Sequence, residues 1–190
     1  MATAATFNLA KLKTALASGG ARSNLFEFSI TSDPLSGTTN FTNMTYFCNV
    51  ASFPGVEITP IEKAYFGRMV KFPGDMVFAD FTTTIYQTEG GQEHTNILKW
   101  MYLINAPNVN QMSADTTSGM DHTGTGNVFQ RTKAGNTTLQ VQFIDMFPTS
   151  VSEIALNYDT TSDFEQFDVT WAYQTFKYIP KGDNTNSTLN

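Results

Sequence analysis

The residue types that most often perform catalysis or bind metals are few in this sequence and lie far apart. The two histidines, His94 and His122, have no cysteine or second histidine at ligand spacing, which argues against a metal site. Cys48 is the only cysteine, so no internal disulfide can form, and we expect a small buried side chain. Asp159 and Asp163 could serve as an acid and a base, but the residues between them are typical of a turn. The sequence thus predicts no catalytic residue, no metal ligand and no cofactor.

Motifs of nucleotide-binding and hydrolytic sites are absent from the sequence. It contains no P-loop, G-x-G-x-x-G, G-x-S-x-G or H-E-x-x-H pattern. Gly124-Thr125-Gly126 is a fragment of a glycine loop, but no hydrophobic strand precedes it. An enzyme is therefore the least favoured class of function.

The charge balance argues against a protein that grips nucleic acid or an anionic membrane. The chain has 11 Lys and Arg against 17 Asp and Glu, a net charge of -6, whereas phosphate binding needs clustered cations. Lys63, Arg68 and Lys71 are interleaved with aromatic residues and could form an RNA-stacking surface, but the excess of acid elsewhere weakens that interpretation. No apolar run approaches the roughly 20 residues of a membrane span, so we expect synthesis in a reducing cytoplasm and no membrane binding.

The elements that would position these residues are mostly strands. A length of 190 residues suggests one domain, and a hydrophobic content of 41% provides for a core. Apolar residues at helical spacing predict helices over 6–18 and 92–105, the second with Ile97, Leu98, Met101 and Ile104 on one face. Alternation predicts strands over 24–31, 44–52, 56–65, 76–87, 126–132, around 139–143, and over 165–178.

Turn and cap signals divide these segments. Pro73-Gly74-Asp75 predicts a turn before the strand at 76–87. Ser150 and Glu153, three residues apart, form a capping-box signature and predict the start of a helical turn. The long polar segment 106–135 predicts a loop. We expect a mainly β fold in which two packed antiparallel sheets form a small β-barrel or sandwich with a flanking helix.

The strand predicted over 76–87 carries large side chains on both faces. Phe81 and Ile85 alternate with Phe78 and Tyr86, so both faces need a cover. One cover is the core of the protein itself, and the other is expected to be a neighbouring subunit. A closed ring of identical subunits would also pair exposed strand edges.

Three stretches of the sequence carry a recognisable pattern. The first is residues 21–28, ARSNLFEF; the second comprises 47–55, FCNVASFPG, then Glu62-Lys63, Gly74-Asp75 and 78–82, FADFT; the third comprises 147–154, FPTSVSEI, and 166–170, QFDVT. In this order they resemble the tail tube proteins of contractile-tailed bacteriophages, although phenylalanine stands at 81 and 147 where tryptophan is common. The residues that carry the resemblance are Asn24, Phe26, Pro54, Gly74, Asp75, Phe78, Phe81, Pro148 and Glu153.

The resemblance implies a division into an N-terminal arm with a short helix, 1–20, a tail-tube β-barrel domain, 21–180, and a polar C-terminal tail, 181–190. It implies six-subunit rings whose inner sheets join and which stack into a tube inside a contractile sheath. The tube would conduct DNA during ejection. Expected partners are other copies of the chain, the sheath protein, baseplate tube-initiation proteins, the tape measure protein and DNA in the lumen, and the expected location is the virion tail.

An arm over 58–73 is the expected contact between stacked rings. Its expected interface residues are Glu62, Lys63, Tyr65, Arg68 and Lys71, and the charged ones are expected to pair with acidic groups on the next ring. Each exposed pair contributes only about 0–1 kcal/mol, but repetition around a ring and along a tube would fix the register.

Two alternatives to the tube itself stay open at the level of the sequence. A baseplate tube-initiator or a tail-terminator relative would share the motifs, although such proteins often carry an extra domain. A cytoplasmic β-barrel that binds a small ligand would need an enclosed cavity with a few converging polar groups, and no pattern in the sequence marks them.

Overall fold

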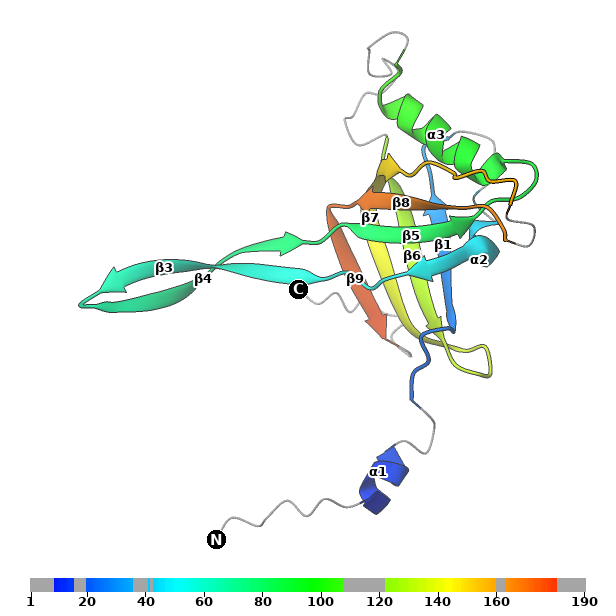
Figure 1. The fold of residues 1–190 in the computed structure, drawn as a ribbon. Coiled ribbons are helices and arrows are strands. Elements are labelled where there is room, and N and C mark those ends of the chain that lie inside the picture. The colour runs from blue at the N-terminus through cyan, green and yellow to red at the C-terminus, as the bar shows by residue number, and fades with distance from the viewer. Residues whose placement is uncertain are drawn as a thin grey trace.

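Two antiparallel sheets pack face to face in the computed structural model, which describes residues 9–15, 20–35, 41, 43–107, 122–159 and 163–180 (Figure 1). The first sheet comprises β1 (Phe26–Ser32), β6 (Gly124–Arg131), the first part of β7 (Thr137–Val151) and β9 (Thr175–Pro180). The second comprises the end of β7, β8 (Gln166–Ala172), β5 (Phe81–Tyr86) and β2 (Cys48–Ala51). The predicted pair of packed antiparallel sheets is confirmed. The barrel is not closed, because no ladder joins β1 to β2 among the described strands.

The strand β7 belongs to both sheets because it bends at Asp145. This residue has a φ of 54°, a left-handed conformation that aspartate tolerates better than most residues. Ile144 pairs with β9, whereas Phe147 pairs with β8. The chain between β8 and β9 turns at the same corner, where the amide of Gln174 donates to the carbonyl of Ile144 (3.1 Å). The single strand predicted over 165–178 is therefore wrong: it is two strands in two sheets.

Aromatic side chains from both sheets fill the core. Phe81 stacks on Phe143 with ring centroids 4.5 Å apart, and Phe28 lies 5.6 Å from Phe81. The indole of Trp171 donates to Thr83 Oγ1 (2.9 Å), which satisfies the buried N–H. The predicted alternation is confirmed over 81–86, where Phe81, Thr83 and Ile85 are buried and the residues between them are not.

The helix α3 (Gln92–Ile104) covers one end of the sheets (Figure 1). Its buried residues are Glu93, Asn96, Ile97 and Trp100, and the Trp100 indole donates to the carbonyl of His122 (2.7 Å). The prediction of a helix is confirmed, but the predicted face is only partly right, because Leu98 and Met101 are half-buried. The apolar pattern did not predict that Glu93 and Asn96 would be buried. Glu93 accepts hydrogen bonds from the amide and the hydroxyl of Thr88 (3.3 and 2.7 Å), whereas Asn96 Nδ2 has no hydrogen-bond partner among the described residues.

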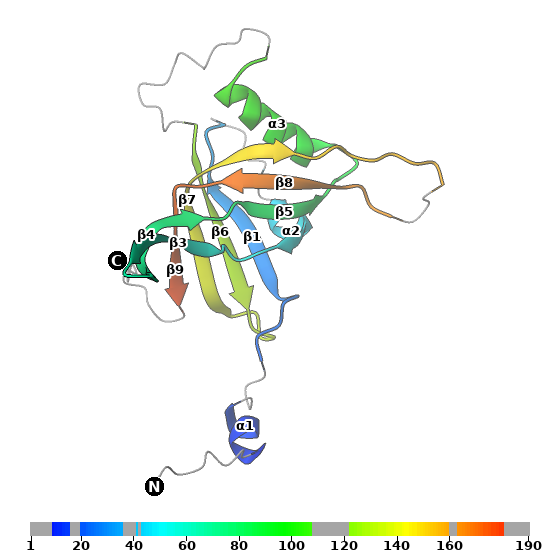
Figure 2. The ribbon, with the colours of Figure 1, turned by 60° about the vertical axis from the view of Figure 1, so that its left-hand side comes forward.

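A long hairpin of β3 (Val56–Tyr65) and β4 (Arg68–Phe78) projects from the barrel (Figures 1 and 2). The predicted strand over 56–65 is confirmed. The turn predicted at Pro73-Gly74-Asp75 is wrong, since these residues lie within β4 at a bulge opposite Thr59. A Cβ on Gly74 would lie 2.3 Å from the carbonyl oxygen of Thr59, so glycine is needed here for close backbone approach.

Three further sequence predictions fail for local reasons. Residues 44–47 form the short helix α2 (Met44–Phe47), so only 48–51 of the predicted strand is extended. The predicted strand over 76–87 breaks at Ala79, whose amide donates to Gly55 and whose carbonyl accepts from the Tyr173 hydroxyl. This break is where the hairpin joins the barrel.

No helical turn begins at Ser150, which remains in β7. The next residues keep running alongside β8, because Ser152 exchanges two hydrogen bonds with Asp168. The N-terminal helix α1 (Leu9–Ala15) agrees with the centre of the predicted helix, whose ends lie outside the described residues. Of the loop predicted over 106–135, residues 108–121 lie outside the described residues, whereas 124–131 form β6, which confirms the strand predicted over 126–132. The tail at 181–190 also lies outside the described residues, and the domain limits stay a prediction.

Candidate assembly interface

The β3–β4 hairpin presents apolar side chains to solvent along both strands. All ten residues of β3 are exposed, and so are most of β4. Its exposed large apolar residues are Val56, Ile58, Ile61, Tyr65, Phe66, Met69, Val70, Phe72, Met76 and Val77. A two-stranded hairpin is only marginally stable alone in water, and exposed apolar patches mark interaction surfaces. The hairpin therefore has the composition of a buried surface, but no described part of its own chain buries it.

The strand register sorts the expected interface residues onto two faces of the hairpin. Lys63 and Tyr65 share one face, and the partner of Tyr65 in the ladder is Arg68. Glu62 and Lys71 are paired on the opposite face, where Lys71 Nζ lies 2.9 Å from Glu62 Oε1. Two of the predicted inter-ring charges thus neutralise each other within one hairpin.

The other face keeps its positive charge. We define the cationic face as Ile61, Lys63, Tyr65, Arg68, Val70 and Phe72. Neither Lys63 nor Arg68 forms an ion pair with any described residue. This face therefore combines two free cations with aromatic and aliphatic surface, a combination suited to an acidic, partly apolar partner.

The tip of the hairpin is a two-residue turn with positive φ at both positions. Phe66 has a φ of 44° and Gly67 a φ of 79°. Such turns favour Asn-Gly, and phenylalanine there costs about 1–2 kcal/mol. Phe66 is 90% exposed, and its ring packs edge-on against Tyr65 with ring centroids 4.6 Å apart. Strain retained at an exposed aromatic residue is typical of a functional contact.

An open hollow of about 870 Å³ lies between the end of β7 and the start of β8. We define the acidic hollow by its carboxylates and its exposed apolar residues, Glu153, Leu156, Tyr158, Asp163, Phe164, Glu165 and Asp168. No cation forms an ion pair with these carboxylates in the part of the chain that the structure describes. This surface was not predicted, because the local sequence pattern at residues 159–163 indicates only a turn.

The residues that carry the family pattern mostly serve the fold. Phe26 opens β1, Pro54 and Pro148 are buried, and Phe78 packs edge-on against Phe176 at the base of the hairpin. The remaining pattern residues are Asn24 before β1, Gly74 at the bulge, Asp75 beside it, Phe81 in the core and Glu153 at the acidic hollow. Of these nine positions, only Asp75 and Glu153 present a charged side chain to solvent.

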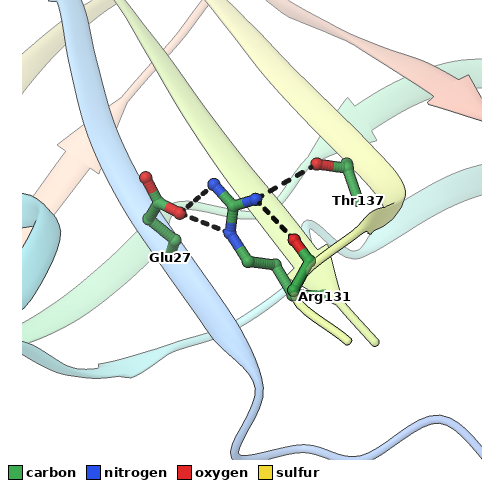
Figure 3. Close-up of polar contacts among 4 residues, drawn as sticks. Glu27, Arg131 and Thr137 are labelled. Carbon is green, nitrogen blue, oxygen red and sulfur yellow. Dashed lines mark hydrogen bonds and ion pairs between the residues drawn. The ribbon is translucent and has the colours of Figure 1, made fainter. Parts of the chain in front are cut away.

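The basic residue Arg131 has a structural role between neighbouring strands. Figure 3 shows its guanidinium between Glu27 of β1 and the start of β7. It forms an ion pair with the Glu27 carboxylate and donates to the Gly135 carbonyl (3.1 Å) and to Thr137 Oγ1 (3.5 Å). Arg131 thereby ties the edge strand β1 to the β6–β7 turn.

The residues that could have done chemistry are not assembled into a site. His94 packs edge-on against Phe167 (5.1 Å), and the ring of His122 is buried. Burial raises the pKa of the Cys48 thiol to about 12, so the reactive thiolate is disfavoured. Within the described ranges no three His, Cys, Asp or Glu side chains cluster as metal ligands would. Nor does any described helix have the length and apolarity needed to cross a membrane.

Comparison with known proteins identifies the family. The chain is 24% identical over 130 residues to the tail tube protein gp19 of Enterobacteria phage T4, an alignment that covers 68% of this chain and 78% of gp19. The phage T6 gp19 is 25% identical over the same length. Both relatives are tail tube proteins by name, as the resemblance of the sequence motifs implied.

Solved structures show the same fold at low sequence identity. The sheath–tube complex of the PVC extracellular contractile injection system contains a chain with a TM-score of 0.60 and 15% identity, covering 92% of this chain and 99% of that one. A chain of the anti-feeding prophage baseplate gives a TM-score of 0.61 at 7% identity, covering 85% and 96%. The family model described as phage tail tube protein matches residues 6–179. The chain therefore belongs to the phage tail tube proteins and is a structural component of a virion tail.

Proposed function

We propose that the protein forms six-subunit rings that stack into the inner tube of a contractile tail, with the hairpin as the contact between rings. The observation that carries this proposal is the hairpin itself: two long strands with exposed apolar residues on both faces and no cover in their own chain. A surface of this kind is stabilised by burial against another molecule. The expected arm residues Glu62, Lys63, Tyr65, Arg68 and Lys71 all lie on it.

Free strand edges support the joining of subunits within a ring. Among the described strands, β1, β2 and β9 each pair along only one edge. Unpaired edges invite pairing with another chain, and neighbouring subunits in a ring would supply the missing strands. The sheets of successive subunits would then form a continuous wall around a channel. The net charge of -6 suits a channel that DNA must pass without binding.

The assemblies that contain the structurally similar chains support the expected partners. One lies in a sheath–tube complex and another in a baseplate, so we propose that this tube is enclosed by a sheath and begins on a baseplate. The tape measure protein and DNA remain proposed occupants of the channel. Assembly and conduction need no catalysis, and we infer that the protein has no enzymatic activity.

A second candidate function is an end of the tube. The baseplate chain and the cap of the anti-feeding prophage match with TM-scores of 0.61 and 0.59, close to the 0.60 of the sheath–tube chain. The fold alone therefore does not separate a repeated tube subunit from an initiator or terminator. The gp19 matches favour the repeated subunit.

Electron microscopy of the purified protein tests the proposal. Negative staining over a range of concentrations, with size-exclusion chromatography and light scattering, should show hexameric rings and tubes of unlimited length. Single rings that never elongate would favour the end-of-tube function. A monomer at every concentration would contradict both.

A further inference from the structure

Two unsatisfied surfaces of this molecule have complementary composition. The cationic face of the hairpin carries Lys63 and Arg68 beside Tyr65 and Phe72, with the exposed Phe66 at the tip. The acidic hollow carries four carboxylates, Glu153, Asp163, Glu165 and Asp168, beside the exposed side chains of Leu156, Tyr158 and Phe164. One surface offers cations and a projecting aromatic pair, and the other offers anions and an open apolar space.

Neither surface has an ion-pair partner among the described residues of its own chain, although Asp168 of the hollow accepts a hydrogen bond from the Thr84 hydroxyl (2.6 Å). The only ion pairs among described residues are Lys71–Glu62 and Arg131–Glu27, and both lie outside the two surfaces defined above. Figures 1 and 2 both show the hairpin and the β7–β8 segment on different sides of the barrel, so a hairpin does not reach its own hollow. A contact between them must join two copies, and because the two patches differ it is heterologous and can propagate.

We propose that the hairpin tip of one copy docks into the acidic hollow of another. The proposal rests on the proposed function and names the receptor surface for the hairpin. Phe66 and Tyr65 would occupy the apolar space beside Leu156 and Phe164, and Lys63 and Arg68 would meet the surrounding carboxylates. The tight turn holds the aromatic pair in a fixed arrangement, which lowers the entropy lost on docking. The hollow is large enough for this contact, because its volume of about 870 Å³ exceeds the combined volume of several side chains.

The N-terminal helix is the competing occupant in this chain. It carries Lys11 and Lys13 with the exposed Leu9 and Leu12. Its described length is only seven residues, and helices this short are marginal without packing. It also has no aromatic residue in the described part. The hairpin matches the hollow in both charge and aromatic content, so we assign the hairpin.

Charge exchange tests the contact. Reversing the charge of the hairpin (Lys63→Glu with Arg68→Glu) should abolish tubes at concentrations where the wild type elongates. Reversing the charge of the hollow (Asp163→Lys with Glu165→Lys) should do the same. All four substitutions together restore the wild-type net charge and should restore tubes. The matched control, Lys99→Glu with Lys133→Glu, changes the charge as much as the hairpin variant does and should leave elongation intact. Circular dichroism of each unassembled variant checks the fold.

The outcomes separate this contact from the proposed function. Wild-type tubes, loss of tubes on hairpin reversal and normal tubes on hollow reversal would overturn the docking contact and leave the tube proposal standing. Rescue of the hollow variant by Lys11→Glu with Lys13→Glu, in place of the hairpin reversal, would assign the hollow to α1 and also overturn it. Absence of wild-type tubes would instead refute the proposed function.

Photo-crosslinking provides a second readout that keeps an aromatic residue at the tip. With benzoylphenylalanine at position 66, irradiated tubes should yield intermolecular crosslinks to peptides within 152–168. The same probe at the exposed position 102 on α3 is the control and should not label that segment. Crosslinks from position 66 concentrated in any other segment would contradict the docking contact.

Discussion

At the scale of single residues, the exposed aromatic Phe66 is a better candidate for function than the histidines or the cysteine. The histidines and the cysteine pack into the fold, whereas Phe66 stands 90% exposed in a strained turn. A residue that is unfavourable for folding and large enough to bury substantial area is a candidate for a contact made only on assembly.

Replacing Phe66 with asparagine should separate folding from assembly. Asparagine tolerates positive φ, so the unassembled protein should be stabilised by about 1 kcal/mol or less. Loss of the ring should nevertheless shorten or abolish tubes. Thermal unfolding of the unassembled protein and electron microscopy of the assembled one measure the two effects. Tubes of normal length from this variant would show that the ring is not an anchor.

The Cys48 thiol should be unreactive in the folded protein at neutral to mildly alkaline pH. Burial raises its pKa from 9.0 to about 12, so the thiolate is scarce until the pH approaches that value. Because the folded pKa is raised, the associated stability is present below pH 9 and is lost as the pH rises toward 12. Alkylation by iodoacetamide at pH 8 should be at least tenfold slower in buffer than in denaturant. Equal rates would show that the thiol is accessible.

At the scale of elements, sequence periodicity predicted strands and helices well where a segment stays in one sheet or one helix along its whole length. The strand over 56–65 and the helix from residue 92 match the structure. The pattern failed at corners: the left-handed Asp145, which takes β7 from one sheet to the other, has no sequence signal that periodicity detects. The single strand predicted over 165–178 was wrong for the same reason, because apolar and polar residues keep alternating where the chain passes from β8 to β9. The acidic hollow could not be predicted from a local pattern, because two separate segments of the chain form it.

Contact between α3 and the sheets should depend on Gly124. A Cβ at this position would lie 2.4 Å from the Ser32 carbonyl oxygen and 2.7 Å from the Trp100 ring. Gly124→Ala should therefore destabilise the protein by about 1–3 kcal/mol, as overpacking does, measured by urea unfolding. Gly20→Ala has open space around it and serves as the control. Equal stability of the two variants would contradict the packing described for this element.

Excision of the hairpin should leave a folded barrel that cannot assemble. Val56 and Phe78 are paired at its base, so an Asn-Gly turn can replace residues 57–77 and keep the strands in register. The core lies entirely outside the removed segment, and near-ultraviolet circular dichroism should retain the aromatic signals of the core. Size-exclusion chromatography should show no tubes. Tubes from the shortened protein would show that the hairpin is dispensable.

At the scale of the whole molecule, an open barrel with unpaired edges and a projecting two-faced ribbon is incomplete as a single copy. The pattern of exposed apolar residues in the hairpin and the free carboxylates of the hollow have a common explanation in burial between copies. Family membership establishes a tail tube protein, and the proposed contact between the hairpin and the acidic hollow would be where its copies meet.

The most direct test of this account is a cryo-electron microscopy reconstruction of the assembled tube, with buried area calculated for each residue. The account predicts that residues 56–78 are largely covered by other copies and that the cationic face lies in the acidic hollow of one of them. A tube in which the hairpin remains exposed to solvent, or in which it contacts no other copy, would contradict the account.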